Sequence, residues 1–376
     1  MDKRIFSRIS GIELLKIIAI FMIVLSHTVD SLRIGYANIF DLHLATVNLQ
    51  KFILIMFRSF SPLGNTIFFV CSAWFFLDNN RTKKEKIFNM ILDIWLVSVI
   101  ILTTAYMLRH GNIDGMLILI SFFPTTFESN WFLTCYILFY AIHGILNNII
   151  NSMSQKQLLR TTIFMVLLYV FANYIIMHGV FLASLLIIWV AIYFFMAYLK
   201  KYCTGIMSNL KLNCLLAFLG IAAHIGIMVA TNFLGLNTKL FSNQLLHWAS
   251  NSSPFFIITA ISLLNIARQM KFKSYMVNYI SSLSLLIYII HENIIVREYY
   301  RPAVIRNMFF SLGTEHIVSW IFELAALIFI CSLIISILYN ATLRKIVGRF
   351  STALYSRIKN IYLSFENFIL KRSGNI

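Results

Sequence analysis

The sequence predicts an all-α, polytopic membrane helical bundle of about ten transmembrane helices, with both termini in the cytoplasm. The first supporting observation is composition: of 376 residues, 60% are hydrophobic and only 12% are charged. The mean hydropathy is +0.81. A soluble domain of this length does not tolerate so apolar a composition, because its surface would be largely hydrophobic. The chain is therefore expected to be a membrane protein with no sizeable soluble domain.

The second observation is a series of apolar runs separated by plausible breaks. A membrane-spanning helix needs about 20 apolar residues, and barrel strands would be shorter and would alternate in polarity. The segment 43–61, which contains Lys51 and Arg58, is either an interfacial helix or an outward extension of the second span. The runs fall near residues 12–32, 62–79, 87–108, 131–150, 159–178, 180–199, 212–233, 252–268, 276–296 and 317–340.

The third observation is the placement of the basic residues. With the N-terminus inside, 22 of the 31 Lys and Arg residues fall on the cytoplasmic side and 6 fall outside. Cytoplasmic loops of membrane proteins carry such an excess, which sets both termini inside and the number of spans even. The net charge of +17 is thus expected to face anionic lipid headgroups of the bilayer, and not nucleic acid.

Two parts of the chain are predicted. Residues 1–340 form the membrane-embedded domain, whose larger outer loops are 109–130 and 297–316. Residues 341–376 form a basic cytoplasmic tail with apolar residues at helical spacing, which is typical of an amphipathic helix in the membrane plane. These apolar positions are Ile346, Phe350, Leu354, Ile358, Ile361, Phe365 and Ile369.

Ionisable residues within the first span are the strongest functional signal. Lys16 and His27 are eleven residues apart, so they project from one helix face about 16 Å apart along the axis. Asp30 follows one turn after His27. Charge within hydrocarbon costs roughly 3 kcal/mol or more, which favours a polar interior with a function. For Lys16 and Asp30 the alternative is snorkelling to the headgroups.

Other polar groups at membrane depth form three further candidate clusters. His291, Glu292 and Arg297 follow the ninth span near its outer end, and Trp131 opens the fourth span, where it is either an interfacial anchor or a binding residue. The inner loop after the second span carries several cations, Arg81, Lys83 and Lys84 among them. Soluble-enzyme motifs are absent, and the five cysteines lack the spacing of a disulfide framework or a zinc site. No metal is predicted.

Four stretches, in order, resemble the acyltransferase-3 family of integral membrane acyltransferases, particularly the bacterial branch that modifies exopolysaccharide and capsule. Residues 8–27 read R-x-S-G-I-E-L-L-K-x10-H, similar to the family's arginine ten residues before a histidine. Residues 61–76 resemble its FFxxSG helix, 130–140 its WF helix, and 281–291 its S-x-G-I-Y-L-I-H helix. The resemblance covers about residues 8–340.

This chain departs from the family pattern at three positions. Lys16 replaces the arginine, which removes the planar fork that binds phosphate or carboxylate in a bidentate manner. Ser72 and Ala73 stand for the SG pair, and Leu286 for the glycine before Ile-Tyr.

The resemblance implies transfer of an acyl group, acetyl or succinyl, from acyl-CoA to a hydroxyl of a cell-surface or lipid-linked carbohydrate. It implies a multi-pass protein of a bacterial plasma membrane, with acyl-CoA, the carbohydrate and the bilayer as partners and possible homo-oligomers. Lys16 and the Arg81, Lys83 and Lys84 loop are expected to bind the CoA phosphates. His291, Glu292, Arg297 and Trp131 are expected to bind the acceptor at the outer mouth.

The expected catalytic residues are His27, Lys16 and Asp30. We expect His27 to act as general base, since histidine suits proton transfer near neutral pH. Asp30 is expected to fix its tautomer. Direct attack of the acceptor on the thioester is favoured over an acyl-enzyme, because no buried serine or cysteine has an obvious base beside it.

Two other functions are compatible with the sequence. One is a transporter or flippase of a polysaccharide-related substrate that uses intramembrane His, Lys and Asp. No inverted repeat or pair of Gly/Pro-broken helices supports it. The other is a structural or sensory protein that kept the fold and lost the chemistry, for which the replacement at Lys16 is the best support.

Overall fold

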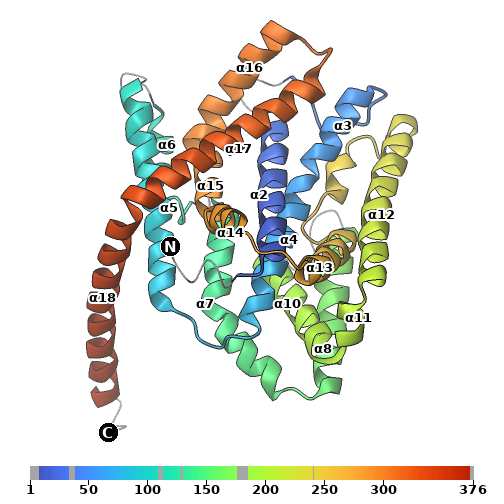
Figure 1. Cartoon of the computed structure of the whole chain (residues 1–376). Helices are drawn as coiled ribbons and strands as arrows, with labels where there is room; N and C mark the ends of the chain where they lie inside the picture. Colours follow the sequence, from blue (N-terminus) through green and yellow to red (C-terminus); the bar gives the residue numbers. More distant parts are fainter. Residues whose placement is uncertain are drawn as a thin grey trace.

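The computed structural model describes residues 8–33, 39–108, 113–127, 130–175, 185–239 and 241–372 (Figure 1). Every regular element in these ranges is a helix, which confirms the predicted fold class. They are α2 (Ser10–Asp30), α3 (Leu49–Arg58), α4 (Phe60–Phe76), α5 (Lys84–Leu108), α6 (Gly115–Phe122), α7 (Trp131–Ser152), α8 (Gln155–Met165), the π-helix η1 (Val166–Ala172), α9 (Asn173–Ile175), α10 (Leu185–Tyr202), α11 (Thr204–Ser208), α12 (Leu210–Asn237), the 3-10 helix η3 (Leu245–Trp248), α13 (Pro254–Gln269), α14 (Tyr275–Ser282), α15 (Ser284–His291), the π-helix η4 (Val296–Tyr300), α16 (Arg301–Leu312), α17 (Ile317–Thr342) and α18 (Arg344–Arg372).

Eight of the ten predicted spans coincide with helical stretches that are long and apolar enough to cross a membrane. Within the described part of the chain, their predicted and observed limits differ by a few residues, except that the second stretch begins at Leu49 and not at residue 62. Residue 178, where the fifth predicted span ends, and residue 180, where the sixth begins, lie outside the described residues. Arg109 of the predicted outer loop lies outside them as well. The eight stretches are Ser10–Asp30, Leu49–Phe76, Lys84–Leu108, Trp131–Ser152, Gln155–Ile175, Leu185–Tyr202, Leu210–Asn237 and Ile317–Thr342.

The ambiguous segment 43–61 lengthens the second span. Only Ser59 separates α3 from α4, and its backbone N–H donates to the carbonyl oxygens of Ile55 and Met56 at 3.2 and 3.1 Å. The helix therefore continues from Leu49 to Phe76. Asn48 caps its beginning, since its side chain accepts a hydrogen bond from the backbone N–H of Lys51.

The two remaining predicted spans are helical but shorter than the sequence indicates. α13 has 16 residues and begins at Pro254, after an N-cap hydrogen bond from the backbone N–H of Phe256 to Ser253. The run 276–296 is divided: Leu283 separates α14 from α15, and Ser282 donates to the carbonyl oxygen of Tyr279 at 2.6 Å. Such side-chain bonds to nearby carbonyls compete with regular helix geometry.

The helix α2 lies at the centre of the bundle and packs against α3, α4, α13, α14, α15 and α17. Small residues allow this close approach. A Cβ atom at Gly64 of α4 would lie 2.7 Å from the carbonyl oxygen of Ala19 and 2.8 Å from Cγ1 of Ile23. Gly11 likewise lies directly against the backbone carbonyl of Ala267 in α13. These contacts hold the functional face of α2 against its neighbours.

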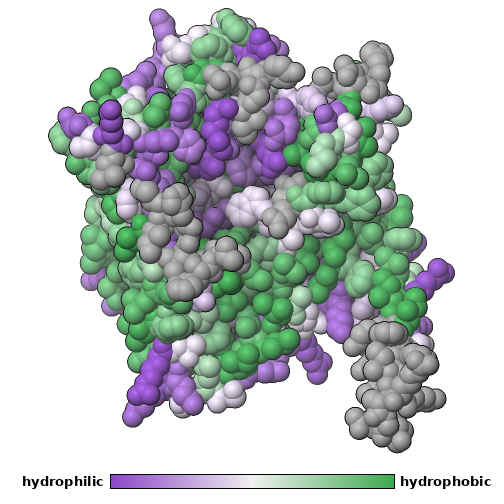
Figure 2. All heavy atoms as spheres, turned by 180° about the vertical axis from the view of Figure 1, so that it is seen from behind, coloured by the Kyte–Doolittle hydropathy of each residue, from purple (hydrophilic) through white to green (hydrophobic). Residues whose placement is uncertain are grey.

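The surface has the polarity expected of a membrane protein. Figure 2 shows a broad hydrophobic belt between two ends rich in hydrophilic residues, and a hollow with hydrophilic walls at one of these ends. Exposed apolar side chains such as Phe218, Phe233 and Leu338 contribute to the belt. Such a continuous apolar surface is compatible with contact to lipid. The chain is thus a multi-pass membrane protein.

The basic tail begins with contacts to the membrane domain. The rings of Phe88 in α5 and Tyr355 in α18 are 5.6 Å apart, and Ser351 donates to the carbonyl oxygen of Glu85 at 3.5 Å. Ile346, Phe350, Ile358 and Ile361 are exposed. The side chains of Phe365 and Ile369 lie outside the described residues. An orientation in the membrane plane stays a prediction.

Substitution of Gly64 tests the packing of α4 on α2. We expect Gly64→Val to lower stability by about 1–3 kcal/mol, because the added atoms overlap Ala19 and Ile23. Gly226→Ala in α12 is the control, since no atom lies within 4 Å of a Cβ there and alanine favours helix. Thermal unfolding in detergent measures both. Equal unfolding temperatures would contradict this packing.

Candidate functional site

The two predicted residues of α2 open to different cavities. Lys16 lines a cavity at the end of the bundle near the start of α2, and His27 lines another near its end. Below they are called the inner cavity and the outer cavity, after the orientation that the basic residues predict. Their separation along α2 follows from the helical rise, about 16 Å over eleven residues. The prediction that both face the protein interior is thus consistent with the structure.

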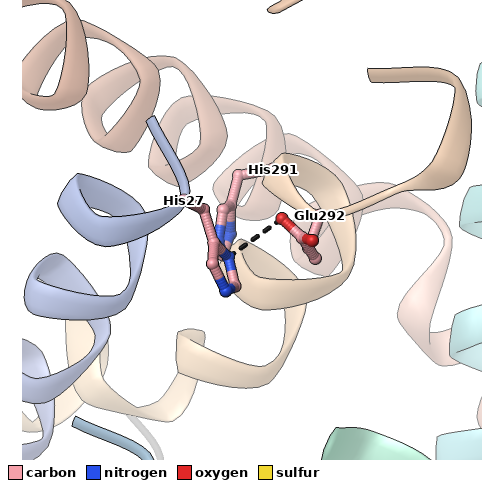
Figure 3. A group of neighbouring side chains, drawn as sticks. All are labelled: His27, His291 and Glu292. Carbon is pink, nitrogen blue, oxygen red and sulfur yellow. Dashed lines mark hydrogen bonds and ion pairs between the residues drawn. The ribbon is translucent and has the colours of Figure 1, made fainter. Parts of the chain in front are cut away.

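His27 is the centre of a buried cluster with His291 and Glu292 (Figure 3). Its Nδ1 lies 2.9 Å from Oε2 of Glu292 and 3.2 Å from Nε2 of His291. All three residues are at most 7% exposed. Glu292 and His291 come from the C-terminal end of α15, which lies beside α2 at this depth.

The hydrogen bonds in this cluster determine which ring nitrogens carry protons. Nδ1 of His291 lies 2.8 Å from the carbonyl oxygen of Ile287, which accepts only, so this nitrogen donates. In the neutral ring, Nε2 of His291 is then an acceptor. Both partners of the His27 Nδ1 are therefore acceptors, which places the proton on Nδ1 and leaves the lone pair on Nε2. His27 is thus oriented as a base through Nε2.

Two arginines hold Glu292 in the buried cluster. Nη2 of Arg301 lies 3.2 Å from Oε2, and Nη1 of Arg297 lies 3.5 Å from Oε1. Arg301 is itself buried and donates through Nε to Oγ of Ser31 at 2.7 Å. Burial lowers the pKa of Arg297, but the charges of Glu292 and Glu298 raise it overall. The carboxylate is therefore compensated by two guanidinium groups and also accepts a hydrogen bond from His27.

The predicted role of Asp30 as the orienting carboxylate is wrong. Its Oδ1 accepts from Nε of Arg58 at 2.6 Å and from Nε of Arg33 at 2.7 Å. The hydrogen bond to Asp30 raises the pKa of Arg33, so this pair stays ionised. Both oxygens of Asp30 are used in this way, since Arg33 Nη2 lies 3.2 Å from Oδ2. Glu292 occupies the position that the sequence assigned to Asp30.

The outer cavity has a volume of about 420 Å³ and is lined almost entirely by polar side chains. Of the predicted acceptor residues, Trp131, Glu292 and Arg297 line it together with His27. His291 is not among its lining residues and lies behind His27. The remaining lining residues are Asp30, Arg33, Arg58, Ser61, Pro62, Asn65, Ala249, Asn251 and Glu298.

The inner cavity has a volume of about 390 Å³, and four cationic side chains and one carboxylate, that of Asp93, line it. Lys16 lines it together with Arg8, Lys86 and Arg344. Nζ of Lys16 lies 2.7 Å from Oε2 of Glu13, which also pairs with Arg8. The first turn of α18 thus contributes to this cavity, through Arg344.

The predicted loop cations lie elsewhere. Arg81, Lys83 and Lys84 are exposed and do not line the inner cavity. The side chain of Asn79 accepts from the backbone N–H of Arg81, and Tyr140 Oη accepts from that of Lys83. Hydrogen bonds from backbone N–H groups, and not from the cationic side chains, therefore hold this loop. Lys86, two residues into α5, is the cation of this segment that reaches the cavity.

Aromatic rings connect the walls of the two cavities. Phe68 and Tyr136 line the inner cavity, and the ring of Phe68 lies 6.1 Å from that of Phe132. Phe132 lies 5.2 Å from Tyr288, whose ring is 6.3 Å from that of His27. This aromatic series separates the cationic cavity from the histidine.

Comparison with known proteins identifies the family. A model of the acyltransferase domain family matches residues 9–341, which is most of the chain. The chain belongs to the acyltransferase-3 family. It is therefore a multi-pass membrane acyltransferase. Neither the comparison with curated proteins nor that with solved structures finds a match. The more specific assignment to an exopolysaccharide branch remains a proposal.

The cluster in this acyltransferase also has the residue types of a metal site, because His27, His291 and Glu292 bring ligand atoms within 4.8 Å of one another. Two nitrogens and a carboxylate oxygen suit zinc. However, Arg301 and Arg297 already bind the carboxylate, so a cation would lie beside two guanidinium groups. A hydrogen-bonded catalytic group fits this charge pattern better than a metal centre does.

Sequence reasoning missed three features of the acyltransferase. It did not pair His27 with Glu292, although His27 ends the first motif and Glu292 directly follows the fourth. It placed Arg344 in a separate tail and overlooked Arg8, which opens the first motif. It also found no serine beside a base, whereas Oγ of Ser61 lies 3.3 Å from Nε2 of His27. The signal for Ser61 was its position at the start of the second motif.

Proposed function

We propose that this acyltransferase transfers an acetyl or succinyl group from acyl-CoA in the inner cavity to a carbohydrate hydroxyl in the outer cavity. The observation that carries the proposal is the orientation of His27, whose Nδ1 is bound by Glu292 while its side chain lines the outer cavity. A bacterial plasma membrane is the proposed location, with a surface or lipid-linked glycan as acceptor.

The charge of the inner cavity supports binding of the donor. Lys16, Arg8, Lys86 and Arg344 present cations to one space, and phosphate groups form strong charge-assisted hydrogen bonds with such side chains. In the orientation that the basic residues predict, this cavity lies toward the cytoplasm, where CoA is available. The thioester would extend along α2 toward His27.

The outer cavity supports binding of a carbohydrate. Asn65 and Asn251 offer amide donors and acceptors, and Trp131 offers an aromatic face on which a sugar ring packs. Arg297 and Arg33 would bind a carboxylate of the acceptor. Few apolar groups line this space, so it suits a hydroxyl-rich ligand better than a lipid chain.

In the reaction, Nε2 of His27 accepts the proton of the attacking hydroxyl. The imidazolium that forms is stabilised by Glu292, as carboxylates stabilise histidine in hydrolytic triads. Loss of the proton from the imidazolium to the departing thiolate then completes the transfer. Glu292 remains a carboxylate because Arg301 and Arg297 pair with it.

A transporter or flippase of a polysaccharide-related substrate is the second candidate. The specific observation in its favour is a pair of polar cavities near opposite ends of the same helix, separated by aromatic rings. Membership of the acyltransferase-3 family favours acyl transfer. An assay with membranes that contain the protein distinguishes the two functions, since only an acyltransferase moves a labelled acyl group from acyl-CoA to glycan.

Replacement of His27 tests the catalytic role. We expect His27→Ala to reduce glycan acylation by at least about 10²-fold, the usual contribution of a general base. Expression and elution in detergent should be unchanged. His43→Ala, in the segment before α3, is the control and should retain activity. Mass spectrometry of the surface glycan measures the product, and full acylation by His27→Ala would contradict the role.

Replacement of the inner-cavity cations tests the donor site. We expect Lys16→Ala and Lys86→Ala each to raise KM for acyl-CoA by about tenfold or more, because a hydrogen bond to a charged group contributes about 1.5–3 kcal/mol. Lys84→Ala is the matched control, since this lysine is exposed outside the cavity. Initial rates with varied acyl-CoA measure the effect. An equal rise in KM for Lys84→Ala would contradict a donor site in the inner cavity and favour binding by the loop of Arg81, Lys83 and Lys84.

A further inference from the structure

Ser61 lies beside the base of the site. Its Oγ is 3.3 Å from Nε2 of His27, it is 3% exposed, and it lines the outer cavity. It stands near the start of α4, which packs directly on α2.

The hydrogen bond of the Ser61 side chain differs from those of the nearby Thr28 and Ser59. Thr28 donates to the carbonyl oxygen of Val24 at 2.8 Å, and Ser59 to that of Met56 at 2.6 Å. Bonds of this kind to a preceding carbonyl are the ordinary arrangement for helical serine and threonine. The hydrogen bond of Ser61 goes to His27 instead.

The proton arrangement makes this contact suitable for nucleophilic catalysis. Because the proton of neutral His27 lies on Nδ1, its Nε2 lone pair accepts the hydrogen bond and Ser61 donates it. Glu292 orients the other side of the ring, at 2.9 Å from Nδ1. Ser61, His27 and Glu292 therefore have the connectivity of a Ser-His-Glu triad, which is recognised by geometry and not by sequence order.

We propose that Ser61 is the nucleophile and carries the acyl group as an ester between donor and acceptor. This inference deepens the proposed function and rests on it. In the first half-reaction Oγ bonds to the thioester carbonyl carbon, its proton moves to Nε2 of His27, and the C–S bond breaks. The thiolate of CoA takes that proton and leaves as the free thiol.

In the second half-reaction the acceptor hydroxyl attacks the acyl-serine. Its proton moves to Nε2 of His27 as the new ester bond forms, and the bond between the acyl carbon and Oγ of Ser61 breaks. Oγ recovers the proton from His27, so the triad returns to its starting state. No oxidant, reductant or additional reactant is needed.

The arrangement of the two cavities favours a mechanism with an acyl-serine intermediate. The donor and the acceptor are expected to enter from opposite ends of α2, and a covalent acyl group allows CoA to leave before the acceptor reacts. Asn65, one turn after Ser61, lines the same cavity. Its Nδ2 is only weakly engaged, 3.4 Å from Oδ1 of Asn251, and would donate to the oxyanion of each tetrahedral intermediate.

The test uses the full-length protein in detergent or liposomes with radiolabelled acetyl-CoA and no acceptor. We expect a burst of free thiol approaching one per chain, exchange of labelled CoA into acetyl-CoA, and acid-stable acyl label on the peptide that contains Ser61. Ser61→Ala should lose all three signals and at least about 10²-fold of glycan acylation. Ser59→Ala is the matched control and should keep them.

The outcomes separate this inference from the proposed function. If wild-type protein acylates glycan and Ser61→Ala retains that rate within a few-fold, Ser61 is not the nucleophile while the proposed function stands. Label on a histidine, or thiol release only when acceptor is present, would also overturn the inference. If wild-type protein transfers no acyl group to any glycan, the proposed function itself fails. Unfolding temperatures of the two serine variants exclude a folding defect.

Discussion

The hydrogen bond from Nδ1 of His27 to the carboxylate of Glu292 is the interaction on which the site depends. It joins the first and ninth apolar runs of the chain, and it orients one imidazole so that its basic nitrogen faces Ser61 and its side chain lines a polar cavity. A carboxylate buried among apolar helices is costly unless charges compensate it. Arg301 and Arg297 provide this compensation. The polar site is therefore stable within an otherwise hydrophobic bundle.

The two cavities divide the reaction along α2. Cations gather in the inner cavity, and the outer cavity has amide, aromatic and guanidinium groups around the histidine. The series of rings from Phe68 to Tyr288 lies between them. Such a division suits a membrane acyltransferase whose donor and acceptor occupy opposite sides of a bilayer. The close packing at Gly64 and Gly11 keeps α2 in place between both spaces.

The bundle and the importance of α2 were predictable because apolar runs and helical periodicity are local properties. The partner of His27 was not, since α2 and α15 meet only through tertiary packing. Asp30 was the nearer carboxylate in sequence, but Arg58 from the ambiguous segment 43–61 captures it. Among neighbouring lysines, Lys86 reaches the inner cavity and Lys84 does not, which depends on where α5 begins.

The most direct measurement of the central claim is nitrogen-15 NMR of the His27 ring, assigned from the His27→Ala spectrum. We expect the neutral ring to carry its proton on Nδ1 and none on Nε2, because Glu292 and His291 both accept from Nδ1. In Glu292→Gln this preference should weaken. A neutral ring with its proton on Nε2, or an even mixture of both forms in the wild-type protein, would contradict the account.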